Sequence, residues 1–289
     1  MSEIRDRVAV ITGAASGIGR ALARELASRG AQLALADQNS AGLEETRKML
    51  GSAVARSYTV DVANAAAVEE FARRVQQDFG RASLLINNAG VALFGTFAEL
   101  TLEEFDWLIR INFWGTVYGC KFFLPLLLRE SDARIVNISS VFGLFGPPGQ
   151  TAYCASKFAV RGFSESLREE LRATPVKVTC VHPAGIATNV AVNARVGEAT
   201  RADEQQAALE RFNKVAQISP ETAAQTIIGG ILKNQDRVLI GRDAYRIDFM
   251  SRLLPARASK MISSWMQKRT ANEETASAAP TTSGSKATS

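Results

Sequence analysis

Seven short apolar segments, each followed by a polar turn or a longer helical segment, constrain this fold more than any other feature. The apolar segments span residues 8–11, 32–36, 53–58, 83–86, 134–138, 176–181 and 237–240. They are apolar throughout rather than alternating, which is typical of strands covered by helices on both faces. Segments with helical periodicity lie between them, at 18–29, 41–50, 65–79, 102–128, 152–173 and 220–232. This alternation favours parallel pairing with right-handed crossovers, and therefore predicts an α/β fold: a doubly wound three-layer sandwich with a seven-stranded parallel sheet.

The residues outside this alternation suggest how the chain is divided. The pattern ends near residue 240, so we expect a single domain over residues 1–250. Within it, residues 186–218 contain no segment typical of a strand, and we expect a helical lid or loop there. Residues 251–269 place apolar side chains at helical spacing beside basic ones, which predicts a basic amphipathic C-terminal helix. Residues 270–289 have no large apolar side chain, so we expect a disordered tail.

The net charge of +5 is concentrated in the predicted C-terminal helix. That stretch carries no acidic residue and five basic ones: Arg252, Arg257, Lys260, Lys268 and Arg269. The rest of the chain has no net charge. We therefore expect no nucleic-acid-binding face. Residues 252–269 would suit contact with a membrane surface. The interpretation we favour is that they pack against the body of the protein or against a partner subunit.

Three cysteines, Cys120, Cys154 and Cys180, lie far apart and lack the spacing of metal ligands. We expect reduced thiols and no metal site. No window approaches the ~18 uninterrupted apolar residues of a membrane span. The first residues are charged and lack the apolar core of a secretory signal. Together these features indicate a cytoplasmic protein.

A glycine-rich turn separates the first predicted strand from the first helix. It contains Gly13, Ser16, Gly17, Ile18 and Gly19. Glycines at such a turn allow a pyrophosphate to approach the backbone, and the free amides at the helix N-terminus favour its negative charge. The glycine spacing differs from G-x-G-x-x-G, so a turn that binds no ligand is the alternative. With this turn, the doubly wound sheet would be a Rossmann-like nucleotide-binding fold.

Asp37 ends the second predicted strand, eighteen residues after Gly19. A carboxylate there can accept hydrogen bonds from both hydroxyls of the adenosine ribose and would repel a 2′-phosphate. Neither Gln38 nor Ser16 supplies a cation for such a phosphate. The sequence therefore favours NAD as the cofactor over NADP. The alternative for Asp37 is a solvated turn residue.

Further motifs follow the later predicted strands in order. They are Asp61-Val62, Asn87-Asn88-Ala89-Gly90, Asn112, Ser140 and Tyr153-Cys154-Ala155-Ser156-Lys157. With the glycine turn, these motifs resemble the short-chain dehydrogenase/reductase family over roughly residues 7–240. The resemblance implies that residues 1–250 form a Rossmann-fold catalytic domain of an oxidoreductase that uses NAD or NADP.

The resemblance also implies which residues bind the cofactor. Asp61 and Val62 would hold the adenine, and Asn88, Ala89 and Gly90 would line the path past the fourth strand. The nicotinamide carboxamide would be held by Pro183, Ile186 and Thr188. The family usually has glycine where this chain has Ala184. If that position requires a positive φ, alanine strains the loop.

Tyr153 and Lys157 lie four residues apart in a predicted helix and therefore on one face of it. A free tyrosine has a pKa near ~10, and the Lys157 ammonium can lower it by stabilising the phenolate. Tyr153 would then act as general acid and base, and Lys157 would also bind the nicotinamide ribose. Ser140, at the end of the fifth strand, would donate a hydrogen bond to the substrate oxygen. A strand alternates its faces, so only one of Ser139 and Ser140 points into this site, and the resemblance to the family implies that it is Ser140.

Two polar residues leave alternatives open. Asn112 would hold a water that leads from Lys157 to solvent, or it is a buried hydrogen-bonding residue between helices. His182, the single histidine, is interpreted as a packing residue near a strand end. Arg195 in the expected lid could bind an acid, although a solvated charge is the interpretation we favour.

Apolar residues surround the expected site. They include Leu93, Phe94, Phe97, Val141, Phe142, Leu144, Phe145, Pro147 and Pro148, and the lid adds Val190, Val192 and Phe212. Such a pocket suits a bulky hydrophobic secondary alcohol or ketone, of a steroid-like, terpenoid or aromatic kind. The competing functions are a non-catalytic nucleotide-binding protein and a membrane-surface regulatory protein. The helices at 102–128 and 152–173 resemble those through which the family pairs subunits, which implies a homodimer or homotetramer.

Overall fold

The structure, a computed structural model, describes residues 3–187, 194–200, 217–258, 260–262 and 264. Its main sheet has seven parallel strands in the order β3-β2-β1-β4-β6-β7-β9. The strands are β1 (Val8–Thr12), β2 (Gln32–Asp37), β3 (Ala55–Thr59), β4 (Leu84–Asn87), β6 (Ala133–Ile138), β7 (Val176–Pro183) and β9 (Arg237–Ile240). The predicted sheet is confirmed, and each predicted strand lies within about two residues of the observed one.

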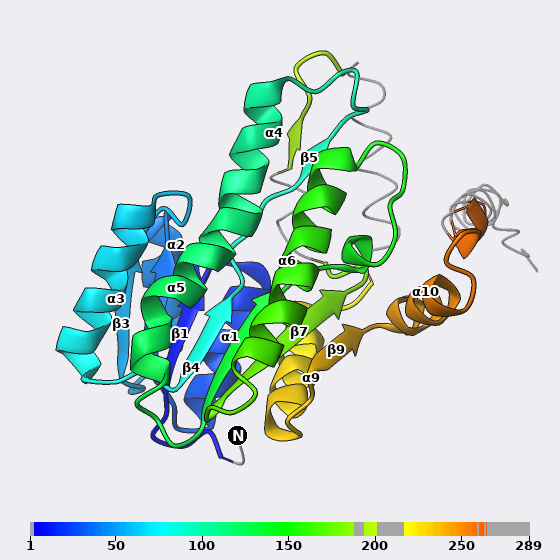
Figure 1. Cartoon of the computed structure of the whole chain (residues 1–289). Helices are drawn as coiled ribbons and strands as arrows, with labels where there is room; N and C mark the ends of the chain where they lie inside the picture. Colours follow the sequence, from blue (N-terminus) through cyan, green and yellow to red (C-terminus); the bar gives the residue numbers. More distant parts are fainter. Residues whose placement is uncertain (1–2, 188–193, 201–216, 259, 263, 265–289) are drawn as a thin grey trace, which may run out of the picture.

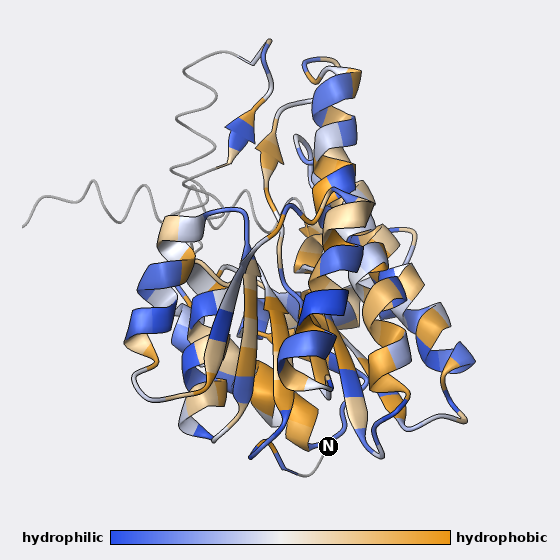
Figure 2. Cartoon of the chain, turned by 90° about the vertical axis from the view of Figure 1, so that its left-hand side faces the viewer, coloured by the Kyte–Doolittle hydropathy of each residue, from blue (hydrophilic) through white to orange (hydrophobic). Residues whose placement is uncertain are grey.

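Helices cover both faces of the sheet (Figure 1). One face carries α1 (Gly17–Ser28), α2 (Ser40–Met49) and α9 (Pro220–Leu232), which pack against β1, β2 and β4. The other carries α3 (Ala65–Phe79), α5 (Gly115–Leu127) and α6 (Thr151–Glu170). Each face buries its own apolar cluster, because successive strand residues point to opposite faces. Figure 2 shows this as apolar strands between helices whose polar residues face outward.

The helix predicted over 102–128 is interrupted. It consists of α4 (Leu102–Ile109), a π-helical turn η1 (Arg110–Trp114) and α5. Short π-helical turns inside α-helices commonly mark functional sites. The turn carries Asn112, whose contacts are described below.

A small second sheet lies outside the predicted pattern. It pairs β5 (Leu93–Phe94) with β8 (Arg195–Val196), and Ile186 forms an isolated bridge with Ile218. The expectation of no strand at 186–218 is therefore wrong at β8, because a two-residue strand is too short to show any periodicity. In Figure 1, this sheet and α4 extend beyond the main body. Residues 188–193 and 201–216 of the expected lid lie outside the described residues.

A helix that the sequence did not predict, α10 (Arg242–Leu253), lies before most of the range 251–269 in which the C-terminal helix was expected. It ends shortly before Pro255, which interrupts helical structure, and residues 258, 260–262 and 264 within the expected range are again helical. Ala258 and Ile262 are buried in a cluster that includes the inner face of α10. The expected tail at 270–289 lies outside the described residues. None of the described helices is both long and apolar enough to cross a membrane.

Candidate active site

The residues expected to bind and react lie beyond the carboxyl ends of the parallel strands. The glycine turn follows β1, Asp37 ends β2, Asn88 follows β4 and Ser140 follows β6. Ligands of doubly wound sheets bind at this edge, because the chain crosses there from one face to the other. The fold therefore gathers residues that are more than a hundred positions apart in the sequence.

The glycine turn is too closely packed for side chains. Gly13 has φ 67°, and a methyl group there would lie 2.8 Å from Cα of Ala89. At Gly19, in the first turn of α1, a methyl group would lie 2.1 Å from the carbonyl oxygen of Gly13. Gly17 has φ 51°. Two glycines of the turn thus keep the backbone free of side chains next to the N-terminus of α1, where the first amides have no partner within the helix. This arrangement fits the pyrophosphate of a dinucleotide.

Asn88 and Thr12 hold the turn against β4. The Asn88 side-chain amide donates to the carbonyl oxygens of Thr12 at 2.9 Å and Gly13 at 3.1 Å. The Thr12 hydroxyl accepts from the backbone N–H groups of Asn88 at 3.0 Å and Ala89 at 3.1 Å. Thr12 was not identified from the sequence, where its only distinction is that it precedes Gly13.

Arg20 and Thr46 fix the other side of the turn, and neither was identified from the sequence. The Thr46 hydroxyl donates to the carbonyl oxygen of Ala14 at 2.9 Å. Arg20 Nε donates to Thr46 Oγ1 at 2.9 Å, and its Nη2 binds the carbonyl oxygen of Ala15 and the carboxylate of Glu45. The charge of Arg20 is therefore engaged within the protein.

Two carboxylates end neighbouring strands at this edge. Asp37 accepts from the backbone N–H of Ala15 at 3.0 Å, which ties β2 to the glycine turn. Asp61 is exposed and accepts from the backbone N–H of Ala63 at 2.9 Å. Val62 is buried beside Gly115 of α5. These side chains line the end of the edge expected to hold adenosine.

Ser140, Tyr153 and Lys157 converge at the opposite end. Tyr153 forms a hydrogen bond with Ser140, and Lys157 Nζ lies 5.6 Å from the centroid of the Tyr153 ring. Lys157 Nζ also donates to the carbonyl oxygen of Ile138 at 3.0 Å. The Ser139 hydroxyl instead donates to the Lys157 carbonyl oxygen at 2.8 Å, so the two serines point in different directions.

Burial sets the pKa values of this pair. It raises the pKa of Tyr153 to about 12, although the hydrogen bond with Ser140 acts in the opposite direction. It lowers the pKa of Lys157 to about 8. The direction for Tyr153 is opposite to that expected from the sequence, because the desolvation of the phenolate outweighs any stabilisation by Lys157. In the protein alone, the Tyr153 hydroxyl is therefore protonated at neutral pH.

The side-chain amide of Asn112 forms hydrogen bonds within the protein. Its Nδ2 donates to the Val91 carbonyl oxygen at 2.9 Å and to Ser156 Oγ at 3.2 Å, and its Oδ1 accepts from the Val91 N–H at 2.8 Å. These contacts match the alternative of a buried residue that links helices. A methyl group at Gly90 would lie 3.2 Å from Asn112 Oδ1 and 3.4 Å from Lys157 Nζ. The absence of a side chain at Gly90 thus leaves space next to Asn112 Oδ1 and Lys157 Nζ.

The loop after β7 is described as far as Ala187. Pro183 ends the strand and Ile186 is buried, while Thr188 lies outside the described residues. Ala184 does not have a positive φ, which is found instead at Gly185 (54°). Alanine at position 184 therefore strains nothing, and its methyl group packs in the cluster beneath α10.

Only part of the expected apolar pocket faces Tyr153. Leu93 is buried in the cluster that Tyr153 packs against, and the Phe142 ring lies edge-on to that of Tyr153 at 6.1 Å between centroids. By contrast, three residues belong to the cluster beneath α10: Val141, Leu144 and Phe145. Phe97 is exposed, and the three expected lid residues lie outside the described ones.

Arg195 is exposed, as expected for a solvated charge, but it also contacts an aromatic ring. Its guanidinium stacks on the indole ring of Trp107, with 3.9 Å between Cζ and the ring centroid. This cation–π contact fixes β8 over α4.

Known proteins resemble this chain in both sequence and structure. The family model described as short chain dehydrogenase matches residues 7–199. SadH of Mycobacterium tuberculosis, which is named as an oxidoreductase, is 44% identical over 274 residues, which is 93% of this chain and 98% of SadH. A short chain dehydrogenase/reductase from Burkholderia phymatum, solved with NAD, has a TM-score of 0.82 and 32% identity over 87% of this chain and 95% of its own. An alcohol dehydrogenase from Thermococcus sibiricus, solved with 5-hydroxy-NADP, has a TM-score of 0.70 and 26% identity over 82% of this chain and 96% of its own.

Proposed function

Because the chain belongs to the short-chain dehydrogenase/reductase family of oxidoreductases, we propose that it uses NAD(H) to interconvert a bulky hydrophobic secondary alcohol and its ketone. The observation that carries this proposal is the convergence of Ser140, Tyr153 and Lys157 at one end of the strand edge. The dinucleotide, when bound, supplies or accepts the hydride. The protein must then hold the substrate oxygen and move one proton.

Tyr153 is the proposed proton carrier. Its pKa of about 12 keeps the hydroxyl protonated at neutral pH, so it can donate a proton to a carbonyl oxygen that gains negative charge. Ser140 donates a hydrogen bond to the same oxygen. In the oxidative direction, the Lys157 ammonium supports the phenolate form of Tyr153, because Nζ lies 5.6 Å from the centroid of the Tyr153 ring and Lys157 is buried.

The glycine turn and the residues after β4 are the proposed binding surface for the dinucleotide. Its pyrophosphate would lie against Gly13, Ser16, Gly17, Ile18 and Gly19; at Gly13 and Gly19 an added side chain would clash with the backbone. Asn88, Ala89 and Gly90 would line the next part of the site. Lys157 would bind the nicotinamide ribose, and Pro183, Ile186 and Thr188 would hold the carboxamide.

Asp37 supports NAD over NADP. Its carboxylate lies at the strand edge beside the glycine turn, where it would accept from ribose hydroxyls and repel a 2′-phosphate. The cation nearest in sequence to the turn, Arg20, is engaged by Glu45 and by backbone carbonyl oxygens. A phosphate there would therefore have to displace existing contacts.

The substrate class follows from the surroundings of Tyr153. The Phe142 ring packs edge-on against its ring, and both lie beside apolar clusters, which makes these surroundings apolar. We expect steroid-like, terpenoid or aromatic secondary alcohols to fit better than phosphorylated sugars.

We also expect a homodimer or homotetramer. Trp114 and Phe158 expose 43% and 42% of their surface on η1 and α6. Trp114 stacks on Tyr118 at 5.7 Å between centroids, so the aromatic surface continues along α5. Exposed aromatic patches of this kind mark protein interfaces.

The direct test is to follow NADH absorbance with a panel of hydrophobic secondary alcohols, and the reverse reaction with their ketones. We expect turnover with at least one bulky apolar alcohol and none with phosphorylated sugars. Turnover limited to charged substrates would contradict the proposed substrate class. Dinucleotide binding without turnover in either direction would favour a non-catalytic nucleotide-binding protein.

A further inference from the structure

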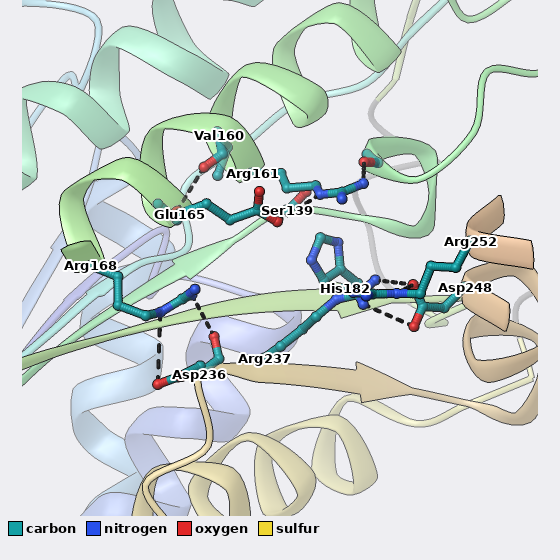
Figure 3. A network of polar contacts seen from close by, with 12 residues as sticks. Ser139, Val160, Arg161, Glu165, Arg168, His182, Asp236, Arg237, Asp248 and Arg252 are labelled. Carbon is teal, nitrogen blue, oxygen red and sulfur yellow. Dashed lines mark hydrogen bonds and ion pairs between the residues drawn. The ribbon is translucent and has the colours of Figure 1, made fainter. Parts of the chain in front are cut away.

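His182 lies on β7 with its side chain fully buried, close to the proposed catalytic residues but outside their set. In the sheet register, Cys180 pairs with Arg237 of β9. Side chains two residues apart on a strand point to the same face, so His182 and Arg237 share one face of the sheet. Figure 3 shows the imidazole beside the Arg237 side chain, between α6 and α10.

Within the part of the chain that the structure describes, the imidazole has one hydrogen-bond partner, the backbone of Ser140. His182 Nδ1 lies 3.0 Å from the carbonyl oxygen of Ser140. A carbonyl oxygen can only accept, so Nδ1 carries the proton and donates it. The same oxygen also accepts from the Gly143 N–H at 2.9 Å, which begins the turn η2 (Val141–Gly143). Ser140 is thus held through its backbone from two sides.

The far side of the imidazole faces a cation. Arg237 binds Asp248 of α10 through both terminal nitrogens, one of them at 2.8 Å, and Asp248 also accepts from Arg252 at 3.0 Å. Among the described residues, neither His182 Nε2 nor Arg237 Nε has a hydrogen-bond partner, although both are buried. With the proton on Nδ1, His182 Nε2 is an acceptor, whereas Arg237 Nε is a donor. A donor on this side is compatible with the tautomer that binds Ser140.

His182 is therefore neutral at working pH. Burial is the main cause that lowers its pKa to about 4, and the charges of Arg237 and Arg161 lower it further. A buried imidazole with one unpartnered nitrogen costs desolvation free energy that an apolar side chain would avoid. Packing alone does not explain it, whereas a bond to the backbone of Ser140 does.

We infer that His182 is a positioning residue, which holds the backbone of Ser140 so that the serine hydroxyl faces Tyr153. The Arg237–Asp248 pair keeps the imidazole in place and thereby links α10 to the site. This inference rests on the proposed function, because it gives His182 a role only through Ser140.

The first test compares His182→Asn, His182→Gln and His182→Leu. The Asn amide can place a donor close to Nδ1, whereas Gln places it farther out and Leu has none. We expect Leu and Gln to lower kcat by about tenfold to a hundredfold, as small misplacements of catalytic groups do, with little change in the KM for NAD. Asn should restore most of the rate. Should Leu fail to fold, the difference between Asn and Gln still decides.

The second test repeats His182→Gln in a Ser140→Ala background. Without the hydroxyl to position, the substitution should cost little further kcat, so the two effects should not add. Cys180→Ala, on the same strand and face, is the matched control and should lower stability without changing kcat. Equal losses in both backgrounds, or no loss in Gln and Leu with a native unfolding curve, would overturn the positioning role. Full activity of Ser140→Ala alone would instead refute the proposed role of Ser140.

Discussion

The carboxylate of Asp37 accepts a hydrogen bond from the backbone N–H of Ala15, with 3.0 Å between Oδ2 and the nitrogen. Its other oxygen accepts from the N–H of Asn39, also at 3.0 Å. Each oxygen keeps a lone pair for another donor. One carboxylate therefore both shapes the glycine turn and places negative charge where a ribose would lie. A substitution that tests cofactor choice must keep the contact with the glycine turn while removing the negative charge.

Asp37→Asn comes nearest to this condition: its amide oxygen can still accept from Ala15 while the charge is lost, although its amide nitrogen cannot accept from Asn39, so that second contact is given up. The parent should prefer NAD over NADP by about a hundredfold or more in kcat/KM, since charge-assisted bonds contribute roughly 1.5–3 kcal/mol each. Asp37→Asn with Gln38→Arg should bring the ratio near one or invert it. Asp61→Asn, on the neighbouring strand, is the control and should leave the ratio unchanged. If the parent already uses both cofactors equally, Asp37 does not face the ribose.

Tyr153→Phe tests the proton carrier. It removes one hydroxyl, so kcat should fall by about 10²–10⁴-fold, the usual contribution of acid–base catalysis. NADH binding, followed by fluorescence, should hardly change. Tyr58→Phe is the matched control, because Tyr58 is also a buried tyrosine but bonds Asp78 far from the site. Residual activity within about tenfold of the parent would exclude Tyr153 from this role.

Lys157 should make stability depend on pH. Its pKa falls from 10.5 in the unfolded chain to about 8 on burial. Between these values the unfolded chain binds more protons, so the free energy of unfolding should rise with pH, by about 2 kcal/mol at most between about pH 8 and pH 10. The rise should be absent in Lys157→Met.

Urea unfolding of the parent and of Lys157→Met at both pH values measures this effect. The difference between the two proteins is the informative quantity, because the buried tyrosines and cysteines titrate in both. A difference that stays constant with pH would show that Lys157 keeps its ordinary pKa.

The sheet could be predicted from the sequence because strands buried on both faces leave continuous apolar segments. The interruption at η1 could not. Asn112 pairs there with the backbone of Val91, twenty-one residues away, and such a contact has no local pattern. The two-residue strands β5 and β8 are likewise too short for periodicity to reveal.

The residues of the candidate site also differ in whether they could be predicted from the sequence. The helical spacing of Tyr153 and Lys157 places them on one face, and the resemblance to the family implied that Ser140 joins them. The contacts of Thr12 and His182 depend on which residues face each other across strands, and hence on register. The high pKa of Tyr153 also escaped prediction, since it depends on how much water the fold excludes.

The last prediction concerns Gly90, where a substitution should weaken cofactor binding without lowering the stability of the fold. Its φ is not positive, so alanine is compatible with the backbone there. A methyl group would nevertheless enter the space beside Asn112 Oδ1 and Lys157 Nζ, at 3.2 and 3.4 Å. Gly90→Ala should therefore leave the melting temperature within a few degrees of the parent and raise the KM for NAD about tenfold, a loss of ~1.4 kcal/mol. Gly13→Ala should behave differently and lower the melting temperature, because φ 67° and the contact with Ala89 strain the backbone itself. Gly146→Ala is the control, since nothing lies within 4 Å of its added methyl group. An unchanged KM in Gly90→Ala would mean that the cofactor does not lie against Gly90, and the proposed nicotinamide end of the site would have to lie elsewhere on the strand edge.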